Sequence, residues 1–397
     1  MQVIKSFGHL FGGTLLVTGT SLGVGMLALP VATAAGGFLP SLFIYLICWL
    51  FMLGTGLLIL EACIWMPKDA NLITLSHHLL GRGGKVACWI LYLFLFFCLM
   101  VAHLAGGGSV LTQLSANSIT SWKSIILYLI LFSPVVYLGT RWVDRLNLLL
   151  MAGAILTFLI FVGTSLSHVE MEKLMPMNWG KAWGALPIVF TAFGYQSLIP
   201  TLVTYMDRDI KKVRWAIIVG SSLPFLIYVI WEMLILGIIP LEGPGGLKEA
   251  LALGQNAVHP LGAFVKNPTL ITIGQAFAFF VLTTSYMGIA IAFVDFLADG
   301  LKVPNKGWNK VGICAIIFIL PTLIALVDPS IFLQALNYAG GIGVALLLGA
   351  LPIMMVWNGR YKQKLSLKQQ QLPGGKALLC FMMLFIAIEL VITLQGI

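Results

Sequence analysis

The residues of this chain best placed to bind a polar ligand lie at 18–30, in the sequence TGTSLGVGMLALP. Glycines and hydroxyl side chains there interrupt a run that is otherwise apolar enough to span a membrane. In hydrocarbon every backbone N–H and C=O group needs a partner within the protein, so irregular backbone at membrane depth occurs where it lines a cavity or binds a ligand. The segment is therefore a candidate site, and freed backbone amides and carbonyls would supply its chemistry.

The element that must position this segment is a membrane-spanning helix, one of eleven that the sequence predicts. The chain has 397 residues, 59% hydrophobic and 9% charged, and its mean hydropathy is +1.00. Apolar stretches long enough to cross about 30 Å of hydrocarbon predict an all-α, polytopic membrane protein with one membrane domain, residues 1–397, and no soluble domain. The predicted spans are 7–36, 38–65, 86–114, 122–138, 148–167, 183–206, 213–239, 270–297, 311–327, 331–357 and 377–394.

Basic residues predict the side of the bilayer that each connection faces, because cytoplasmic loops carry an excess of lysine and arginine. With the N-terminus inside, only five of the 23 fall on outer loops: Lys123, Lys173, Lys181, Lys248 and Lys266. We therefore expect a cytoplasmic N-terminus and an outer C-terminus. The formal net charge of +9 follows from this topology, so the lipid bilayer is the expected partner and no nucleic acid is implied.

Metal and cofactor sites are not indicated. The six cysteines are scattered in or beside spans without a C-x-x-C pair, which predicts neither a disulfide framework nor a metal site. Gly23 and Gly25 lack the preceding strand and the third glycine of a dinucleotide-binding loop. We therefore expect no cofactor.

The sixth span carries a second interruption, because Gly194, Gln196 and Pro200 fall inside an apolar helix. Corresponding breaks in the first span of each half are typical of transporters built from inverted repeats, with the substrate near the midplane. The spans accordingly divide into repeats at about 7–167 and 183–357, followed by an extra helix at about 377–394. Alternatively, glycines spaced four apart in the first span could serve close helix packing alone. The outer loop 240–267, with a short helix expected at 247–253, either covers the outer mouth or is a plain connector.

Three segments carry a resemblance to a known family. Residues 19–30, GTSLGVGMLALP, resemble the first-helix signature of the bacterial hydroxy and aromatic amino acid permeases, close to G-T-x-[IL]-G-x-G-M-L-A-[LM]-P. Residues 191–196, TAFGYQ, with Pro200, are similar to that family's sixth-helix motif, and residues 57–61 resemble the end of its second helix. The resemblance covers essentially the whole chain and is strongest with the tyrosine-specific branch. Gln196 departs from it, because the family more often has histidine there.

The resemblance implies a LeuT-type fold of five plus five inverted repeats with one extra C-terminal helix. It further implies a symporter, not an enzyme, that imports an aromatic amino acid, tyrosine first, across the bacterial cytoplasmic membrane by alternating access. The proton gradient is the implied driving force. A sodium-coupled permease, or one of broader specificity for neutral and hydroxy amino acids, is the alternative.

An amino acid substrate would need both of its charges satisfied at the midplane without water. The amides that open the second half of the broken first helix suit the carboxylate, because a helix N-terminus exposes N–H groups and positive dipole. Unwound carbonyls suit the ammonium. We assign the carboxylate to Gly23, Val24, Gly25 and Met26, and the ammonium to Thr18, Gly19, Thr20, Ser21, Thr191 and Ala192.

The side chain of the substrate would need a largely apolar pocket with a few polar groups. The candidates are Phe193, Tyr195 and Gln196 on the sixth span, His103 on the third, Tyr286 on the eighth, and Asn337 and Tyr338 on the tenth. Each aromatic side chain could equally be a packed core residue. His103 is the only histidine deep inside a span, and ionisable groups within the membrane commonly mark function, although a neutral, hydrogen-bonded structural histidine is the alternative.

The coupling ion has two candidate sites on the eighth span. Thr283, Thr284 and Ser285 resemble the hydroxyls that complete a sodium site in LeuT-type transporters, whereas Asp295 is a candidate protonation site on the same helix face as Thr284. The proton is preferred, mainly because of the resemblance. Lys5 and Asp299 lie where LeuT-type proteins place a cytoplasmic gate ion pair. Glu232 and Glu389 receive no role from the sequence.

A different class of function fits one short motif. Gly19-Thr-Ser-Leu-Gly23 matches G-x-S-x-G, the pattern around a nucleophilic serine. An intramembrane serine hydrolase, with His103 as the base for Ser21, is therefore a remote alternative. It would leave the second helix break unexplained.

Overall fold

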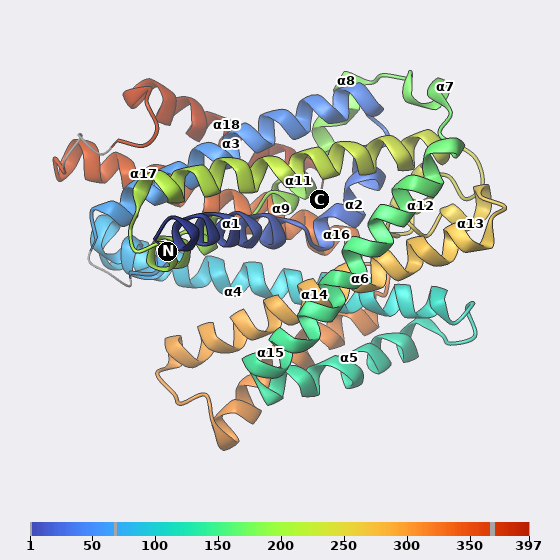
Figure 1. The fold of residues 1–397 in the computed structure, drawn as a ribbon, viewed down its shortest axis with the longest axis horizontal. Coiled ribbons are helices and arrows are strands. Elements are labelled where there is room, and N and C mark those ends of the chain that lie inside the picture. Colours follow the sequence, from blue (N-terminus) through green and yellow to red (C-terminus); the bar gives the residue numbers. More distant parts are fainter. Residues whose placement is uncertain (1, 67–69, 366–369, 397) are drawn as a thin grey trace.

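The protein forms one bundle of helices (Figure 1), and the computed structural model describes residues 2–66, 70–365 and 370–396, with side chains from His9 onward. In this part of the chain ten helices are long and apolar enough to cross a membrane, and the bent pair α1 (Gln2–Ser21) and α2 (Val24–Thr33) makes an eleventh span. The eleven predicted spans are thereby confirmed. The unbroken ones are α3 (Phe38–Ile64), α4 (Leu72–Leu114), α5 (Ser121–Leu138), α6 (Thr140–Ser165), α11 (Ile210–Ile238), α14 (Pro268–Leu301), α15 (Gly307–Val327) and α18 (Gly375–Gln395).

Both predicted breaks are present. The axes of α1 and α2 differ by 51° across Leu22 and Gly23. The sixth span consists of α9 (Leu186–Ala192), the single turn η3 (Gln196–Leu198) and α10 (Ile199–Tyr205). The tenth span is continuous but changes its helical pitch along α16 (Phe332–Tyr338), η4 (Ala339–Ala350), α17 (Leu351–Trp357) and η5 (Asn358–Lys362).

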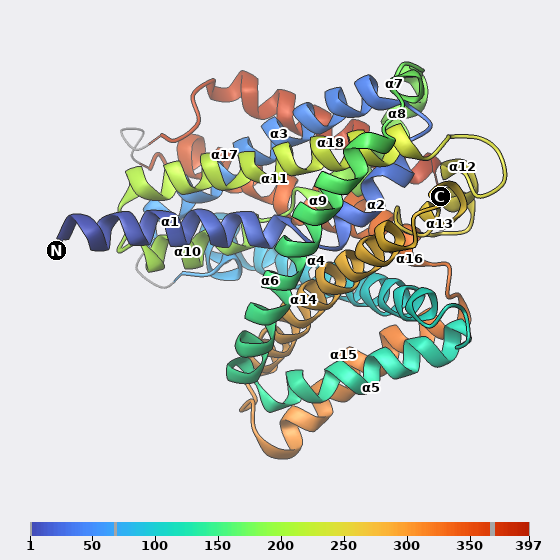
Figure 2. The same cartoon turned by 45° about the vertical axis from the view of Figure 1, so that its right-hand side comes forward.

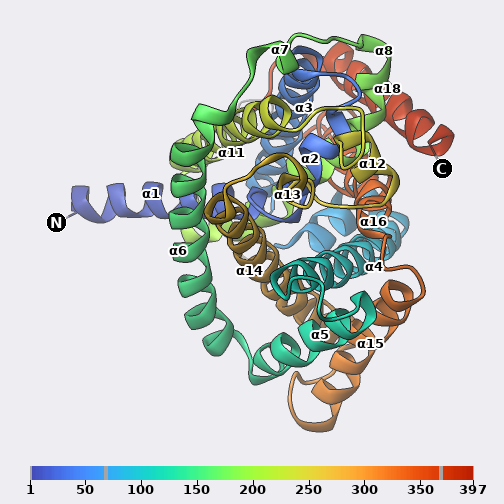
Figure 3. The ribbon, with the colours of Figure 1, turned by 90° about the vertical axis from the view of Figure 1, so that its right-hand side faces the viewer.

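The second half of the broken first span, α2, lies near the centre of the bundle (Figure 3). Nine of the ten residues of α2 are buried, against five of the 26 residues of α6, which lies at the periphery. α2 packs against α9 and α11, and α11 also packs against α1 and α3. α14 completes the centre by packing against α4 and α6. The apolar sequence of α2 thus reflects burial in protein rather than exposure to lipid.

The connection between the second and third spans differs from the polar loop that the sequence predicts at 66–85. α4 begins already at Leu72, where the Asn71 side chain accepts a hydrogen bond from the Thr74 amide at 2.9 Å and so caps the helix. Leu75 and Leu79, in this first part of α4, are fully buried. Gly81, at φ +77°, then separates it from the membrane span, since few other residues adopt that conformation.

The two termini lie at opposite ends of the bundle (Figure 2), called here the N-terminal and C-terminal ends. Short helices cover the C-terminal end: α7 (Met171–Leu174), α8 (Trp179–Ala182), α12 (Leu247–Ala252) and α13 (Leu261–Phe264), with single turns η1 (Leu166–His168) and η2 (Trp183–Ala185). The short helix predicted in the 240–267 loop is confirmed as α12. The amide of Ala257 in this loop donates to the carbonyl of Leu27 at 2.9 Å, so the loop is fastened to α2.

A buried ion pair fastens the N-terminal end. The Arg360 guanidinium donates from Nε to Glu61 Oε1 at 2.6 Å and from Nη2 to Glu61 Oε2 at 2.7 Å, and both side chains are at most 1% exposed. Glu61 Oε2 also accepts from the Gln371 amide at 2.8 Å. The pair therefore joins the end of α3 to η5 and to the segment that leads into α18.

Candidate functional site

The first break exposes the start of a helix in the middle of the bundle. Gly23 is extended, at φ −152° and ψ −152°, and no side chain caps α2. Within a helix the first N–H groups have no carbonyl to bond, so the amides of Val24 and Gly25 face away from α2 and carry its positive dipole end. Of the four amides predicted to bind a carboxylate, that of Met26 instead donates to the Gly23 carbonyl at 3.1 Å, because it closes the first turn of α2, so Val24 and Gly25 offer the amides of this helix N-terminus.

The second break lies directly beside the first. A Cβ atom added at Gly25 would stand 2.7 Å from Cα and 2.9 Å from Cβ of Ala192, the last residue of α9. Only glycine permits this approach, because the near neighbour is backbone and cannot rotate away. The start of α2 and the end of α9 are therefore in contact.

Gln196 braces the second break through its side-chain amide. Its Oε1 accepts from the Tyr195 amide at 2.9 Å, and its Nε2 donates to the Met52 carbonyl at 3.1 Å and to Thr55 Oγ1 at 3.2 Å. The side chain is fully buried. Gln196 consequently ties the interrupted backbone to α3 and does not face a ligand.

Tyr228 of α11 joins the two breaks. Its hydroxyl lies 2.5 Å from the carbonyl oxygen of Ser21 and 2.9 Å from that of Ala192. These are the last residues of α1 and α9, where carbonyls lack partners within the helix and the dipole is negative. One O–H proton serves only one of two acceptors at a time. The sequence did not single out Tyr228, because a tyrosine in an apolar span is indistinguishable from a core aromatic residue.

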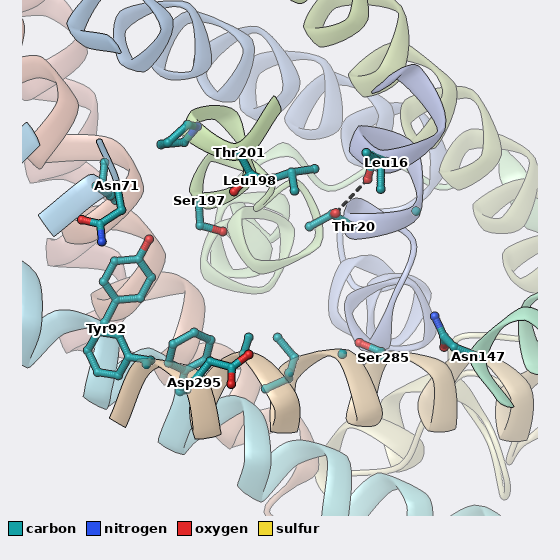
Figure 4. Close-up of a pocket in the computed structure, with 18 of the residues that line it drawn as sticks. Leu16, Thr20, Asn71, Tyr92, Asn147, Ser197, Leu198, Thr201, Ser285 and Asp295 are labelled. Atoms are coloured by element: carbon teal, nitrogen blue, oxygen red, sulfur yellow. Dashed lines mark hydrogen bonds between the residues drawn. The ribbon is translucent and has the colours of Figure 1, made fainter. Parts of the chain in front are cut away.

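A cavity of about 770 Å³ extends from the first break toward the N-terminal end (Figure 4). Its wall includes Gly19 and Thr20 of α1 and, on α14, Thr284, Ser285, Asp295 and Asp299. Residues that the sequence did not propose also line it: Asn71, Tyr92, Phe96, Asn147, Ser197, Thr201 and Phe296. The lining thus combines hydroxyl, amide and carboxylate groups with aromatic rings.

His103 stands behind this wall and contacts it through Ser285. Its Nδ1 lies 2.6 Å from the Leu99 carbonyl oxygen and its Nε2 lies 2.8 Å from Ser285 Oγ. A carbonyl can only accept, so Nδ1 carries the proton and Nε2 accepts from the serine hydroxyl. A Cβ atom at Gly23 would come within 2.8 Å of Ser285 Oγ. Ser285 therefore touches the break and is oriented by His103.

Asn147 of α6 reaches the same wall and accepts a hydrogen bond from the Thr284 hydroxyl. The sequence prediction began this span at residue 148, one residue too late to include the amide, whereas α6 begins at Thr140. Asn147 was missed for that reason.

Several proposed side chains point elsewhere. The Tyr195 hydroxyl donates to the Met52 carbonyl at 3.3 Å, and the Thr283 hydroxyl accepts from Tyr128 at 3.3 Å. Tyr286 is buried against Tyr128, His103 and Phe318. Neither Tyr286 nor Thr283 lines the cavity, because each is about 100° around α14 from its cavity-facing neighbour. Asn337 and Tyr338 of α16 are also absent from the cavity wall.

The remaining predicted residues surround the breaks without lining the cavity. Phe193 is buried between Tyr45 and Tyr228. The Thr191 hydroxyl donates to the Leu336 carbonyl at 2.9 Å, and that of Thr18 to the Gly220 carbonyl at 3.0 Å. The first hydroxyl thus joins α9 to α16, and the second joins α1 to α11.

The last two predictions concern the gate pair, Lys5 and Asp299, and the serine hydrolase alternative. Asp299 lines the cavity, but the side chain of Lys5 lies outside the described residues. The Ser21 hydroxyl donates to the Val17 carbonyl at 3.3 Å, and His103 bonds Ser285. Among the described residues, Ser21 therefore has no hydrogen-bonded base of the kind that the G-x-S-x-G motif would require.

Comparisons with known proteins agree with this architecture. The model of the tryptophan/tyrosine permease family matches residues 7–393. Similar proteins include tyrosine-specific transport system 1 of Haemophilus influenzae, 30% identical over 353 residues and covering 88% of each chain. The tryptophan-specific transport protein of Pseudomonas aeruginosa is 28% identical over 344 residues, covering 83% of this chain and 82% of the relative.

Among solved structures, that of MhsT in complex with L-phenylalanine is similar, with a TM-score of 0.64 at 14% identity. It covers 97% of this chain and 98% of the other. This likeness confirms the predicted LeuT-type fold.

Proposed function

Because this chain belongs to the tryptophan/tyrosine permease family, we propose that it imports aromatic amino acids, tyrosine first, together with protons. It is a multi-pass protein of the bacterial inner membrane. The N-terminus faces the cytoplasm in this proposal, as the distribution of basic residues indicates. The cavity then opens to the cytoplasm, and the protein is in its inward-open state.

The contact of Tyr228 with both helix breaks is the observation that carries the proposal. Two carbonyl oxygens, of Ser21 and Ala192, compete for one hydroxyl proton. An ammonium group brings three donors and would satisfy both, so it would displace the hydroxyl. The adjacent amides of Val24 and Gly25, at the start of α2, would take the carboxylate of the same molecule.

The substrate ring would extend into the cavity between α1 and α14. Gly19 of α1 leaves room, while Ser285 and Asn147 offer polar groups near the break. A pocket that hydrogen-bonds a phenol hydroxyl discriminates strongly against an analogue that lacks it. These two side chains therefore favour tyrosine. Tryptophan remains the competing substrate, since the relatives include proteins named for each.

Proton coupling is preferred over sodium in this proposal because only part of the predicted sodium site faces the cavity. A sodium site there would draw on Thr283, Thr284 and Ser285, but Thr283 faces α5. Thr284 and Ser285 line the cavity and donate their protons to Asn147 and His103. Asp295, exposed on the cavity wall and contacted by Asn305 Nδ2 at 2.9 Å, could exchange a proton with the cytoplasmic side. Asp299 with Lys5 would form the cytoplasmic gate.

Transport into proteoliposomes tests this proposal. Radiolabelled tyrosine should accumulate under an imposed proton gradient and not under a sodium gradient at clamped pH. Unlabelled tryptophan and phenylalanine should compete with labelled tyrosine for uptake. Serine and glutamine should not compete if the transporter is specific for aromatic amino acids. Absence of gradient-driven accumulation of any aromatic or hydroxy amino acid would contradict the proposal. Accumulation under sodium alone would favour the sodium-coupled alternative, and labelling of Ser21 by a fluorophosphonate would revive the hydrolase.

A further inference from the structure

Three carboxyl groups of the described chain are fully buried within the bundle: Glu61, Glu232 and Glu389. Glu61 has the guanidinium of Arg360 as its counter-charge. Glu389 lies on α18, outside the central helices, and accepts a hydrogen bond from Thr393 at 2.9 Å. Glu232 lies on α11 in the centre and forms no ion pair with any described residue. A buried carboxylate without a cation is costly, so this group requires another explanation.

The hydrogen bonds around Glu232 require one proton more than its neighbours can supply. Thr33 Oγ1 lies 2.5 Å from Glu232 Oε1 and 2.7 Å from the Leu29 carbonyl oxygen, while the Tyr45 hydroxyl lies 2.7 Å from Glu232 Oε2. These are three contacts between oxygen atoms, but the two hydroxyls carry only two protons. A proton on Oε1 completes the set: Glu232 donates to Thr33, Thr33 donates to Leu29, and Tyr45 donates to Oε2.

We propose that Glu232 is the proton-binding site of this transporter and that its protonation is coupled to the position of α2. Thr33 is the last residue of α2, whose opposite end carries the amides assigned to the substrate carboxylate. When Glu232 loses its proton, both of its oxygens become acceptors and Thr33 must turn its single proton away from Leu29. The loss of the proton thus changes the hydrogen bonding that holds α2 against α11.

A second link runs from Glu232 to the substrate ammonium. Tyr228 lies four residues earlier on α11, and residues so spaced share a helix face. Phe193, next to the second break, packs at ring-centroid distances of 5.2 Å on Tyr228 and 6.5 Å on Tyr45. Tyr45 in turn donates to Glu232. The proposed proton site and the proposed ammonium site are therefore joined through contacting side chains.

The other polar and titratable groups near Glu232 do not offer a competing proton site. α3 contributes Ser41 beside Tyr45, and Ser41 donates to the Gly37 carbonyl at 2.6 Å. α7 contributes Lys173, which pairs with Glu170 at 2.9 Å and donates to the Ile238 carbonyl. α1, α6 and α10 place no charged side chain in hydrogen-bond or ion-pair contact with Glu232 among the described residues.

The proton balance follows from this site. In the outward-open state the Glu232 carboxylate takes one proton from the outer aqueous phase and becomes a carboxylic acid. After reorientation the acid returns that proton to the cytoplasmic phase. One proton and one amino acid zwitterion cross per cycle, with a net movement of one positive charge.

The inference deepens the proposed function and rests on it, so the test separates the two. In proteoliposomes with a pH gradient of about one unit and the membrane potential clamped at zero, wild-type protein should accumulate tyrosine about tenfold for one proton per cycle, because one unit is a tenfold ratio of proton activity. Glu232→Gln, which is permanently uncharged, should fail to accumulate tyrosine yet exchange internal for external tyrosine at nearly the wild-type rate. A pH-sensitive dye inside the vesicles should report no tyrosine-driven proton entry in this variant.

Glu389→Gln is the matched control, because it neutralises a second buried carboxyl group and should keep both accumulation and proton entry. Accumulation by Glu232→Gln at the wild-type level would overturn the inference while leaving the transport proposal intact. Wild-type protein without proton-driven uptake would contradict the proposed coupling itself. The two failures are therefore distinguishable.

Tyr45→Phe tests the same site without removing the carboxyl group, in case Glu232→Gln does not fold. It deletes the donor to Oε2, and a carboxylate that loses a donor is less stable relative to the acid. The pH profile of tyrosine uptake should therefore move upward by about one unit. Tyr195→Phe, which deletes a hydroxyl that contacts α3 elsewhere, should leave the profile unchanged. An unshifted profile in Tyr45→Phe would overturn the inference.

Discussion

The hydroxyl of Tyr228 lies 2.5 Å from the carbonyl oxygen of Ser21, at the point where the first span stops being helical. It also reaches the end of α9, through Ala192. A single side chain from a third helix thus substitutes for the hydrogen bonds that both interrupted helices lack. In the proposed mode of binding, the substrate ammonium would replace this hydroxyl at both carbonyls.

Removing that hydroxyl should separate net transport from exchange. Tyr228→Phe deletes the competitor of the ammonium, so the KM for tyrosine in exchange should fall about fivefold, as expected for about 1 kcal/mol from one hydrogen bond. Net uptake should slow, because the empty carrier must return with two unsatisfied carbonyls. Exchange and net uptake measured in one proteoliposome preparation check this. Tyr195→Phe is the control, and an increased KM in Tyr228→Phe would contradict the displacement model.

Enlarging Gly25 should abolish substrate binding without preventing membrane insertion. A side chain there collides with Cα of Ala192 at 2.7 Å and so pushes α2 and α9 apart. We expect Gly25→Leu to be inserted at normal levels and to bind no tyrosine in a scintillation proximity assay. Gly163→Leu on α6, where no atom lies within 4 Å of the added Cβ, should bind normally. Wild-type affinity in Gly25→Leu would remove the assignment of the carboxylate to these amides.

Ser285 should distinguish tyrosine from phenylalanine. If its hydroxyl bonds the phenol, Ser285→Ala should weaken tyrosine binding about fivefold and leave phenylalanine binding within about twofold. Competition of both amino acids against a common radiolabelled substrate measures the difference. Thr283→Val, on the face of α14 turned toward Tyr128, should not discriminate. Equal losses for both substrates in Ser285→Ala would place the phenol elsewhere.

The ion pair of Glu61 and Arg360 should be structural. Arg360→Met leaves a buried carboxylate unpaired, which should cost about 3–5 kcal/mol and lower the thermal midpoint in detergent. Glu61→Gln combined with Arg360→Met removes both charges and should recover part of that loss, with transport retained. If the double variant lost as much stability relative to wild type as the two single variants lose together, the two residues would act independently.

The breaks were predictable from the sequence because glycine and proline inside an apolar run have few other uses at membrane depth. The rotation of each helix about its axis was not. Tyr286 follows Ser285 in the sequence, but only the packing of α14 against α4, α5 and α6 decides which of the two faces the cavity. The proposed role of Glu232 could not be predicted from the sequence either, because it depends on contacts with Thr33 and Tyr45, which are distant in the chain.

The two breaks differ in how they are held. Across the second, the Gln196 side chain bonds the backbone of its own segment and that of α3, whereas no side chain caps the start of α2 at the first. We therefore expect the second break to be the more rigid of the two and the first to act as a hinge. Motion between inward-open and outward-open states should therefore concentrate in α1, swinging as a lever about Leu22 and Gly23, while the sixth span keeps its shape.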